Sequence, residues 1–159
     1  MNGGMSLIVK STVRWIFGFV LVFGASTVLY GHLTPGGGFA GGVIIACGFI
    51  LWVLSYGGRG RLSFSHAVAS KLDVVGLAAF EVLALAGFLG GVFFLNFVQR
   101  FWPGENFELY SGGVIPAMNL AVGLKVAAAI TLVFLVLTAV RLPEDGSDAD
   151  DLSTLEDAQ

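Results

Sequence analysis

One uninterrupted stretch without charge constrains this chain more than any other feature. Residues 15–58 contain no Asp, Glu, Lys or Arg, a run of about 44 residues. A helix needs about 20 residues to cross the roughly 30 Å hydrocarbon core of a bilayer, so this run is long enough to cross twice. It breaks at residues 31–38, where Pro35 cannot continue a helix and the neighbouring glycines favour a turn. We therefore expect two spans, at 13–30 and 39–56, joined by that turn.

The composition of the rest of the chain extends this interpretation. The 159 residues are 56% hydrophobic and only 12% charged, about half the charge of an ordinary soluble domain. Two further apolar stretches predict spans at 72–98 and 116–140. We expect an all-α integral membrane protein with four transmembrane helices in residues 1–142. A soluble enzyme is excluded, no enzyme activity is expected, and the chain has no basic stripe that would bind nucleic acid.

The basic residues predict the orientation of these helices in a cell (cytoplasmic) membrane, because positive loops favour the cytoplasmic side. With both termini inside, six basic residues flank the cytoplasmic ends of the spans: Lys10, Arg14, Arg59, Arg61, Lys71 and Arg141. Arg100 alone lies outside. A cleaved leader ending near residues 24–26 is a weaker alternative, since cleavage would leave an odd number of spans.

The acidic residues are concentrated at the end of the chain. Seven of the 11 follow Arg141, so residues 143–159 form a polar, acidic tail. Such a composition predicts a disordered, solvated cytoplasmic extension. A docking segment is the alternative.

Small residues mark the start of each even-numbered span. The glycine motif comprises Thr34, Pro35, Gly36, Gly37, Gly38, Gly41 and Gly42, and a related segment contains Gly112, Gly113 and Pro116. Glycines four residues apart allow a second helix to approach closely, which favours helix packing. The alternative is an unwound start to the second span, with free backbone groups lining a polar cavity. We expect the glycines of the third span, at 76, 87, 90 and 91, to form a packing face as well.

Two charged side chains fall well inside the predicted spans, where an ionised group costs about 2.5–3.5 kcal/mol. They are Glu81 in the third span and Lys125 in the fourth, and they are candidates for an ion path. A direct pair between them stays open, because their side chains would lean apart in antiparallel helices. Asp73 is explained more simply as a carboxylate near a helix N-terminus, and is a further ion-path candidate.

The sequence predicts no metal site, because its histidine and cysteine residues are few and far apart. His32 lies at the outer end of the first span without a second ligand at suitable spacing, and Cys47 is the one cysteine. We interpret His32 as an interfacial residue, with protonation or a partner contact as the alternative. No cofactor is expected.

Two sequence strings carry a family resemblance. The segment 30–44, YGHLTPGGGFAGGVI, resembles the signature of the B subunit of the multisubunit Mrp/Mnh sodium/proton antiporters. The segments 111–119, SGGVIPAMN, and 123–126, GLKV, are similar to the other recurrent part of that family. With the four-span layout, the resemblance extends to about residue 142 and leaves the acidic tail outside.

The resemblance implies a non-catalytic membrane subunit of a hetero-oligomer that exchanges Na+, or another monovalent cation, for H+. The implied partners are large antiporter subunits similar to those of respiratory complex I, together with other small membrane subunits. Similar subunits occur in membrane-bound hydrogenases and related respiratory complexes, which is the alternative context. A purely structural subunit that touches no ion is a third interpretation.

Overall fold

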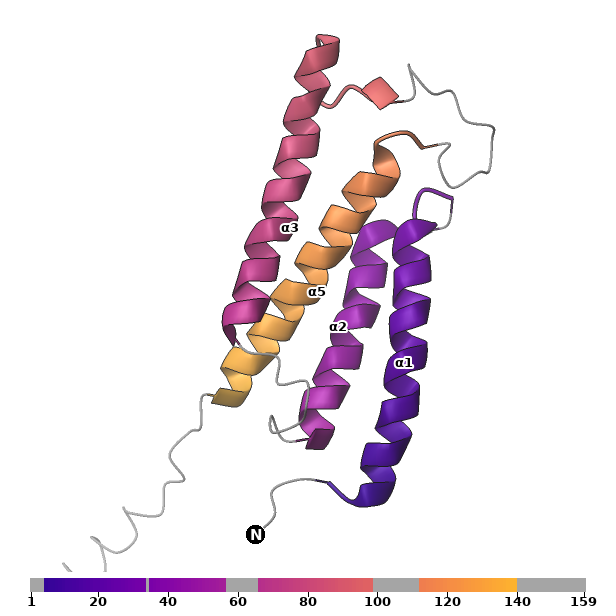
Figure 1. The fold of residues 1–159 in the computed structure, drawn as a ribbon, viewed down its shortest axis with the longest axis vertical. Helices are drawn as coiled ribbons and strands as arrows, with labels where there is room; N and C mark the ends of the chain where they lie inside the picture. Colours follow the sequence, from indigo (N-terminus) through magenta and orange to yellow (C-terminus); the bar gives the residue numbers. More distant parts are fainter. Residues whose placement is uncertain (1–4, 34, 57–65, 99–111, 140–159) are drawn as a thin grey trace, which may run out of the picture.

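The computed structural model describes residues 5–33, 35–56, 66–98 and 112–139, and four long helices account for most of them (Figure 1). They are α1 (Leu7–Leu29), α2 (Gly37–Tyr56), α3 (His66–Ala86) and α5 (Ile115–Ala139), and the short 3-10 helix η1 (Gly87–Gly90) continues α3. Each long helix is long and apolar enough to cross a membrane. The described residues contain no strand, and the expected all-α, four-span fold is confirmed.

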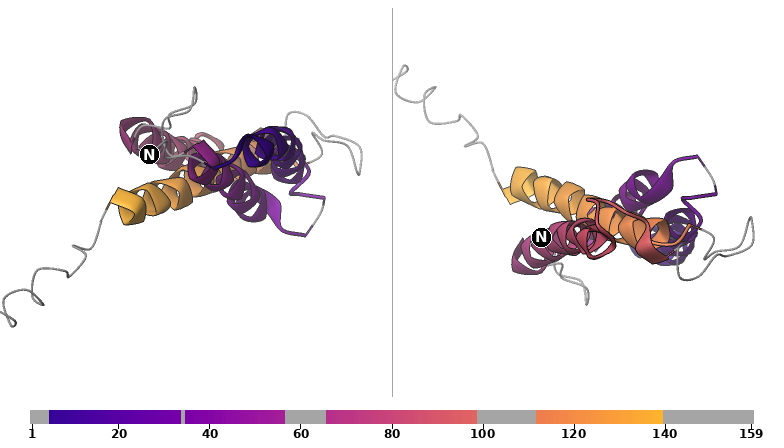
Figure 2. Two further views of the ribbon diagram at one scale, coloured as in Figure 1. Left: turned by 90° about the horizontal axis from the view of Figure 1, so that it is seen from below. Right: turned by 90° about the horizontal axis from the view of Figure 1, so that it is seen from above.

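The helices are arranged as two antiparallel hairpins joined side by side. α1 packs on α2, α3 packs on α5, and the hairpins meet where α2 runs parallel to α5. The order across the molecule is therefore α3, α5, α2, α1 (Figure 1). Viewed along the molecule in Figure 2, α1 is seen nearly end-on while α5 extends across the view, so the two are inclined to each other.

The surface of this arrangement is overwhelmingly apolar. Between 17% and 28% of the residues in each span are buried inside the chain, and α3 has the lowest share. Helices that are apolar all round and largely uncovered are typical of membrane spans whose remaining faces meet lipid or other subunits.

Aromatic side chains join α1 to α2 near the end where α1 begins and α2 ends. The ring of Phe17 lies 4.9 Å from that of Trp52, and Trp52 stacks on Tyr56 at 4.4 Å between centroids. The Tyr56 hydroxyl donates a hydrogen bond of 3.2 Å to the carbonyl of Lys10. This cluster fixes the open end of the first hairpin, opposite the turn at residues 31–36.

The predicted boundaries of two spans were wrong. α1 begins at Leu7, where the Ser6 side chain accepts a hydrogen bond from the backbone of Val9, rather than at residue 13. The third span begins at His66 and ends at Gly90 instead of running from 72 to 98. Gly91 adopts a φ of 102°, which ends the helical segment, and the chain then turns back so that Phe94 bonds to the carbonyl of Ala84.

Candidate functional site

An ion pair links the two helices of the second hairpin. Nζ of Lys125 on α5 lies 2.7 Å from Oδ1 of Asp73 on α3. The side chains are 37% and 27% exposed in the isolated chain. Lys125 is ten residues from the start of α5 and Asp73 is seven residues from the start of α3, so both lie within apolar spans.

A glycine brings the two backbones close enough for this pair to form. A Cβ at Gly76 would lie 2.8 Å from the backbone nitrogen of Lys125, so α3 touches α5 there. Asp73 comes three residues before Gly76 and is turned about 60° from it around the helix, whereas Glu81 comes five residues after it and is turned about 140°. Asp73 therefore lies beside α5, and Glu81 is exposed on another side of α3.

This geometry answers the question of pairing that the sequence left open, and it corrects one expectation about Asp73. Lys125 pairs with Asp73 and not with Glu81, because the helical phase of α3 turns Glu81 away from α5. Asp73 is also not a helix N-terminal residue, since α3 begins seven residues earlier at His66. Because α3 begins earlier than predicted, Asp73 lies inside the span and not at its end.

The glycine junction, which we define as Gly24, Gly38, Gly41, Gly42 and Gly123, holds α1, α2 and α5 together. A Cβ at Gly41 would lie 2.8 Å from the carbonyl oxygen of Gly24, and one at Gly42 would lie 2.7 Å from that of Gly123. At Gly38 a Cβ would overlap the carbonyl oxygen of Asn119. The backbones therefore meet directly, as small residues permit between membrane helices.

The junction uses different glycines of α2 for different neighbours. Gly41 faces α1, while Gly38 and Gly42 face positions 119 and 123 of α5, which are also four residues apart. The buried Val28 of α1 completes the contact, because its side chain touches the positions of both Gly41 and Gly123. α2 is helical from Gly37 onward, so the alternative of an unwound span is wrong for that part of the motif.

The turn before α2 needs glycine for a conformational reason. Gly36 has a φ of 121° and Gly37 a φ of 58°, values that other residues rarely adopt. Pro35 is exposed beside them, and Thr34 lies outside the described residues. The side-chain amide of Asn119 lies against this turn, and its buried nitrogen has no hydrogen-bond partner among the described residues.

The segment before α5 is held by a residue that the sequence analysis missed. The side-chain amide of Asn96 donates to the carbonyl of Gly112 and accepts from the backbone N–H of Val114, each at 3.0 Å. Gly113 between them has a φ of 60°, and Pro116 is the second residue of α5, where its missing N–H costs nothing. A single amide in an otherwise apolar segment was the available signal.

His32 lies at the same end of the molecule. A Cβ at Gly112 would be 3.2 Å from its imidazole ring, so the turn of the first hairpin touches the start of α5. The described residues hold no group of three or more His, Cys, Asp or Glu side chains that could bind a metal ion.

The glycines of the third span divide between two roles. Gly76 packs on α5 as expected. Gly87 and Gly90 instead receive the returning segment of their own chain, because a Cβ at either would meet Leu95. The prediction of one packing face for all four glycines was therefore wrong beyond Gly76.

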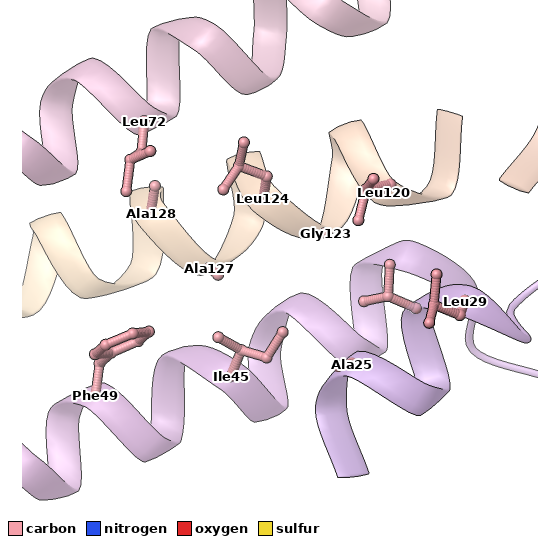
Figure 3. Close-up of a pocket in the computed structure, with 11 residues that line it drawn as sticks. Ala25, Leu29, Ile45, Phe49, Leu72, Leu120, Gly123, Leu124, Ala127 and Ala128 are labelled. Carbon is pink, nitrogen blue, oxygen red and sulfur yellow. The ribbon is translucent and has the colours of Figure 1, made fainter. Parts of the chain in front are cut away.

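An apolar groove of about 320 Å³ lies along α5 (Figure 3). Leu120, Leu124 and Ala128 of α5 line it, and Leu72 of α3 and Phe49 of α2 approach from either side. The groove offers no polar group for chemistry, and the ion pair of Asp73 and Lys125 is not part of its lining.

Comparisons with known sequences place these features in a family. Residues 8–132 match the model of a domain related to the MnhB subunit of Na+/H+ antiporter. An uncharacterized protein of Methanocaldococcus jannaschii is 38% identical over 128 residues, which cover 77% of this chain and 48% of that protein. The chain thus spans about half the length of that relative. The Staphylococcus aureus protein named "Putative antiporter subunit mnhB2" is 24% identical over 135 residues, covering 85% of this chain and 96% of that one.

A solved structure shows the same fold. A chain in the membrane-bound sulfane sulfur reductase, an archaeal respiratory membrane complex, matches with a TM-score of 0.72 and 28% identity. The match covers 86% of this chain and 59% of that one. Since the family model covers most of the chain, including the glycine junction and both members of the ion pair, the chain belongs to the family of domains related to the MnhB subunit of Na+/H+ antiporters.

Proposed function

We propose that this chain is a non-catalytic membrane subunit of a multisubunit complex that exchanges Na+ for H+. The match of residues 8–132 to the MnhB-related domain carries this proposal. The likeness to mnhB2, which extends over nearly the whole of that antiporter subunit, supports it. Large antiporter subunits and other small membrane subunits are the partners that we propose, in the cytoplasmic membrane.

The placement of charge supports a role as one part of a larger complex. Asp73 and Lys125 already neutralise each other, and Glu81 lies on another side of α3. Proton relays through membranes use chains of ionisable side chains. The described spans hold no such continuous chain, so the route for ions must be completed by other subunits.

Within that complex, we propose that the Asp73–Lys125 pair lies on the ion path. The carboxylate and the ammonium are 2.7 Å apart, and each stabilises the charge of the other. A proton or cation that binds the carboxylate would release the ammonium, so the pair can respond to a passing ion. The groups remain partly accessible, which leaves an approach open. His32, at the end of the first hairpin, is a second candidate for contact with protons.

A respiratory complex is the second candidate function. The likeness to a chain of the sulfane sulfur reductase favours it, since that chain belongs to a respiratory membrane complex. In that case the chain would have the same place in an antiporter-like module driven by electron transfer. A purely structural role is the third candidate. Substitution of both charges of the ion pair distinguishes this role from a place on the ion path.

Purification of the intact complex through a tag on this chain tests the proposal. We expect other membrane subunits to co-purify. In vesicles that contain the purified complex and carry a proton gradient, we expect the internal pH to change when Na+ is added outside. Redox subunits among the partners would favour the respiratory complex. Recovery of the chain alone, from membranes solubilised in mild detergent, would contradict both functions.

We further propose that both termini face the cytoplasm. Lys10, Arg14 and Lys71 lie at the end where α1 begins and α3 begins, in keeping with positive residues on the inner side. In a Cys47→Ala background, cysteines placed at Gly60 and Asn106 test this in intact cells. Only the cysteine at position 106 should react with an impermeant reagent, and reaction at position 60 would reverse the orientation.

A further inference from the structure

Glu81 is a carboxylate on an exposed, apolar face. It lies fifteen residues after His66 and nine before Gly90, which places it about 22 Å and about 14 Å from the two ends of this span. Every residue from 74 to 80 and from 82 to 95 is apolar or glycine. Its side chain makes no hydrogen bond or ion pair with any described residue, and Lys125 is already bound by Asp73.

A continuous stripe of exposed residues surrounds it. The residues follow each other at intervals of four and three, so they lie along one side of α3. We call this the Glu81 stripe, and its members are Val74, Ala78, Glu81, Leu85 and Phe88. The contact of α3 with α5 uses Gly76, and the other buried residues of α3, Ala69 and Ala84, also lie outside this stripe. The Glu81 stripe is therefore uncovered.

The position of α3 leaves this stripe uncovered by the other long helices described, and at its end Phe88 contacts the ring of Phe93 at 5.5 Å between centroids. α3 is at the edge of the row and packs on α5 alone among the long helices described (Figure 1). Its upper part also extends beyond α1 and α2 (Figure 1). Four large residues between Glu81 and Gly90 are exposed: Val82, Leu85, Phe88 and, at 90%, Leu89. Exposure of those apolar side chains to water costs free energy, and so does exposure of the ionised carboxylate to lipid.

We propose that the Glu81 stripe is the docking surface for a transmembrane helix of another subunit, and that this helix carries a Lys or Arg at the level of Glu81. The proposal rests on the proposed function, in which the chain is one subunit of a complex. A cation on the partner would neutralise the one charge on this face, and the apolar residues on either side would exclude water and lipid from the pair.

The shape of the stripe suits a helix as the partner. Intervals of four and three residues form the seam along which two helices pack at about 20° to each other. Ala78 lies one turn from Glu81, and its small side chain leaves room for the long side chain of a Lys or Arg. A lipid acyl chain would fill the apolar positions equally well but would leave the carboxylate without a partner.

The first test compares two substitutions in the complex purified through a tag on the full chain. Glu81→Leu should lower the recovery of other subunits by about tenfold or more, because the partner's cation loses its counter-charge. Val82→Leu is the matched control, since Val82 is also exposed, at 64%, and its change leaves charge unaltered. Both variants are at least as apolar as the original chain, so equal amounts in the membrane fraction would show that insertion is preserved.

A second test identifies the partner's residue. In a Cys47→Ala background, a cysteine at Leu85 should cross-link to one membrane helix of another subunit, near a Lys or Arg. Glu81→Lys should abolish co-purification, and changing that partner residue to Glu should restore it. Restoration by charge exchange is a result that a merely misfolded chain could not give.

Three outcomes would overturn the inference. Full recovery of the other subunits with Glu81→Leu would show that the carboxylate is not needed for docking. Normal assembly with loss of antiport would place Glu81 on an aqueous path instead. If the unaltered chain recovers no other subunit, both the proposed function and this inference fail. Full recovery with Glu81→Leu, by contrast, contradicts this inference alone.

Discussion

On one side of α5, Asn119 and Gly123 lie with their backbones against α2, whereas on the other side Lys125 reaches across to Asp73 on α3. Gly123 and Lys125 are about 200° apart around the helix, so α5 presents opposite faces to its two neighbours. The first contact contains no charge and leaves no space for a methyl group. The second needs only one glycine, at position 76, and places two charges in an apolar span.

This difference indicates that the two contacts serve different ends. Direct backbone packing between small residues fixes helix positions and has no group that can exchange a proton or an ion. A charge pair inside a span costs free energy that an apolar pair would not, and its charges are groups that can exchange a proton or an ion. The glycine junction therefore holds the helices together, and the ion-path role that we propose for the Asp73–Lys125 pair would use the second contact.

The largest expected effect is at the glycine junction. Gly38→Leu would force a side chain into the backbone of α5 at Asn119, which cannot move without separating the hairpins. We expect a loss of stability above about 3 kcal/mol and little folded subunit in the complex. Gly18→Leu is the control, because nothing lies within 4 Å of a Cβ there. Equal thermal stability of the two purified variants would show that the junction is dispensable.

Single neutralisation of the ion pair should have the next largest effect. Asp73→Asn leaves the Lys125 ammonium in an apolar span without its counter-charge. Breaking a fully buried pair costs about 3–5 kcal/mol, and partial exposure reduces this to roughly 1–3 kcal/mol. The thermal unfolding midpoint of the detergent-solubilised chain measures it. An unchanged midpoint would mean that the two charges do not stabilise each other.

The contact between the segment that follows α3 and the start of α5 allows a smaller test. Asn96→Ala removes both hydrogen bonds that hold the start of α5, and we expect a loss of about 1–2 kcal/mol. Asn96→Asp keeps the acceptor for the Val114 N–H but loses the donor to the Gly112 carbonyl. Its stability should therefore lie between that of the original chain and that of Asn96→Ala. If Asn96→Ala matches the original chain in the same unfolding measurement, the amide does not position α5.

The smallest effect is expected in the aromatic cluster. Tyr56→Phe keeps the ring stacked on Trp52 and removes only the hydrogen bond of 3.2 Å to the Lys10 carbonyl. The expected loss is about 0.5–1 kcal/mol. A loss as large as that of Gly38→Leu would mean that the open end of the first hairpin, rather than the glycine junction, sets its stability.

Much of this architecture could be predicted from sequence because its signals are local. The uncharged run and Pro35 predict the first hairpin, and glycines four residues apart predict close packing of α2. The partner of Lys125 could not be predicted, because it depends on where α3 begins and on its rotation about its axis. A six-residue error in the start of that helix made Asp73 look terminal, and about 80° of rotation around the axis of α3 separates it from Glu81. Hydropathy reports neither quantity.

The double variant Asp73→Asn with Lys125→Met distinguishes an ion-path role of this pair from a structural one. Removing both charges together leaves no unpaired ion, so the complex should assemble and keep most of its thermal stability. We measure Na+-dependent proton movement in vesicles that contain the purified complex. We expect assembly in normal yield with antiport lowered about tenfold or more. Normal antiport in the assembled double variant would contradict the ion-path role and would leave the pair, like the glycine junction, as a structural contact.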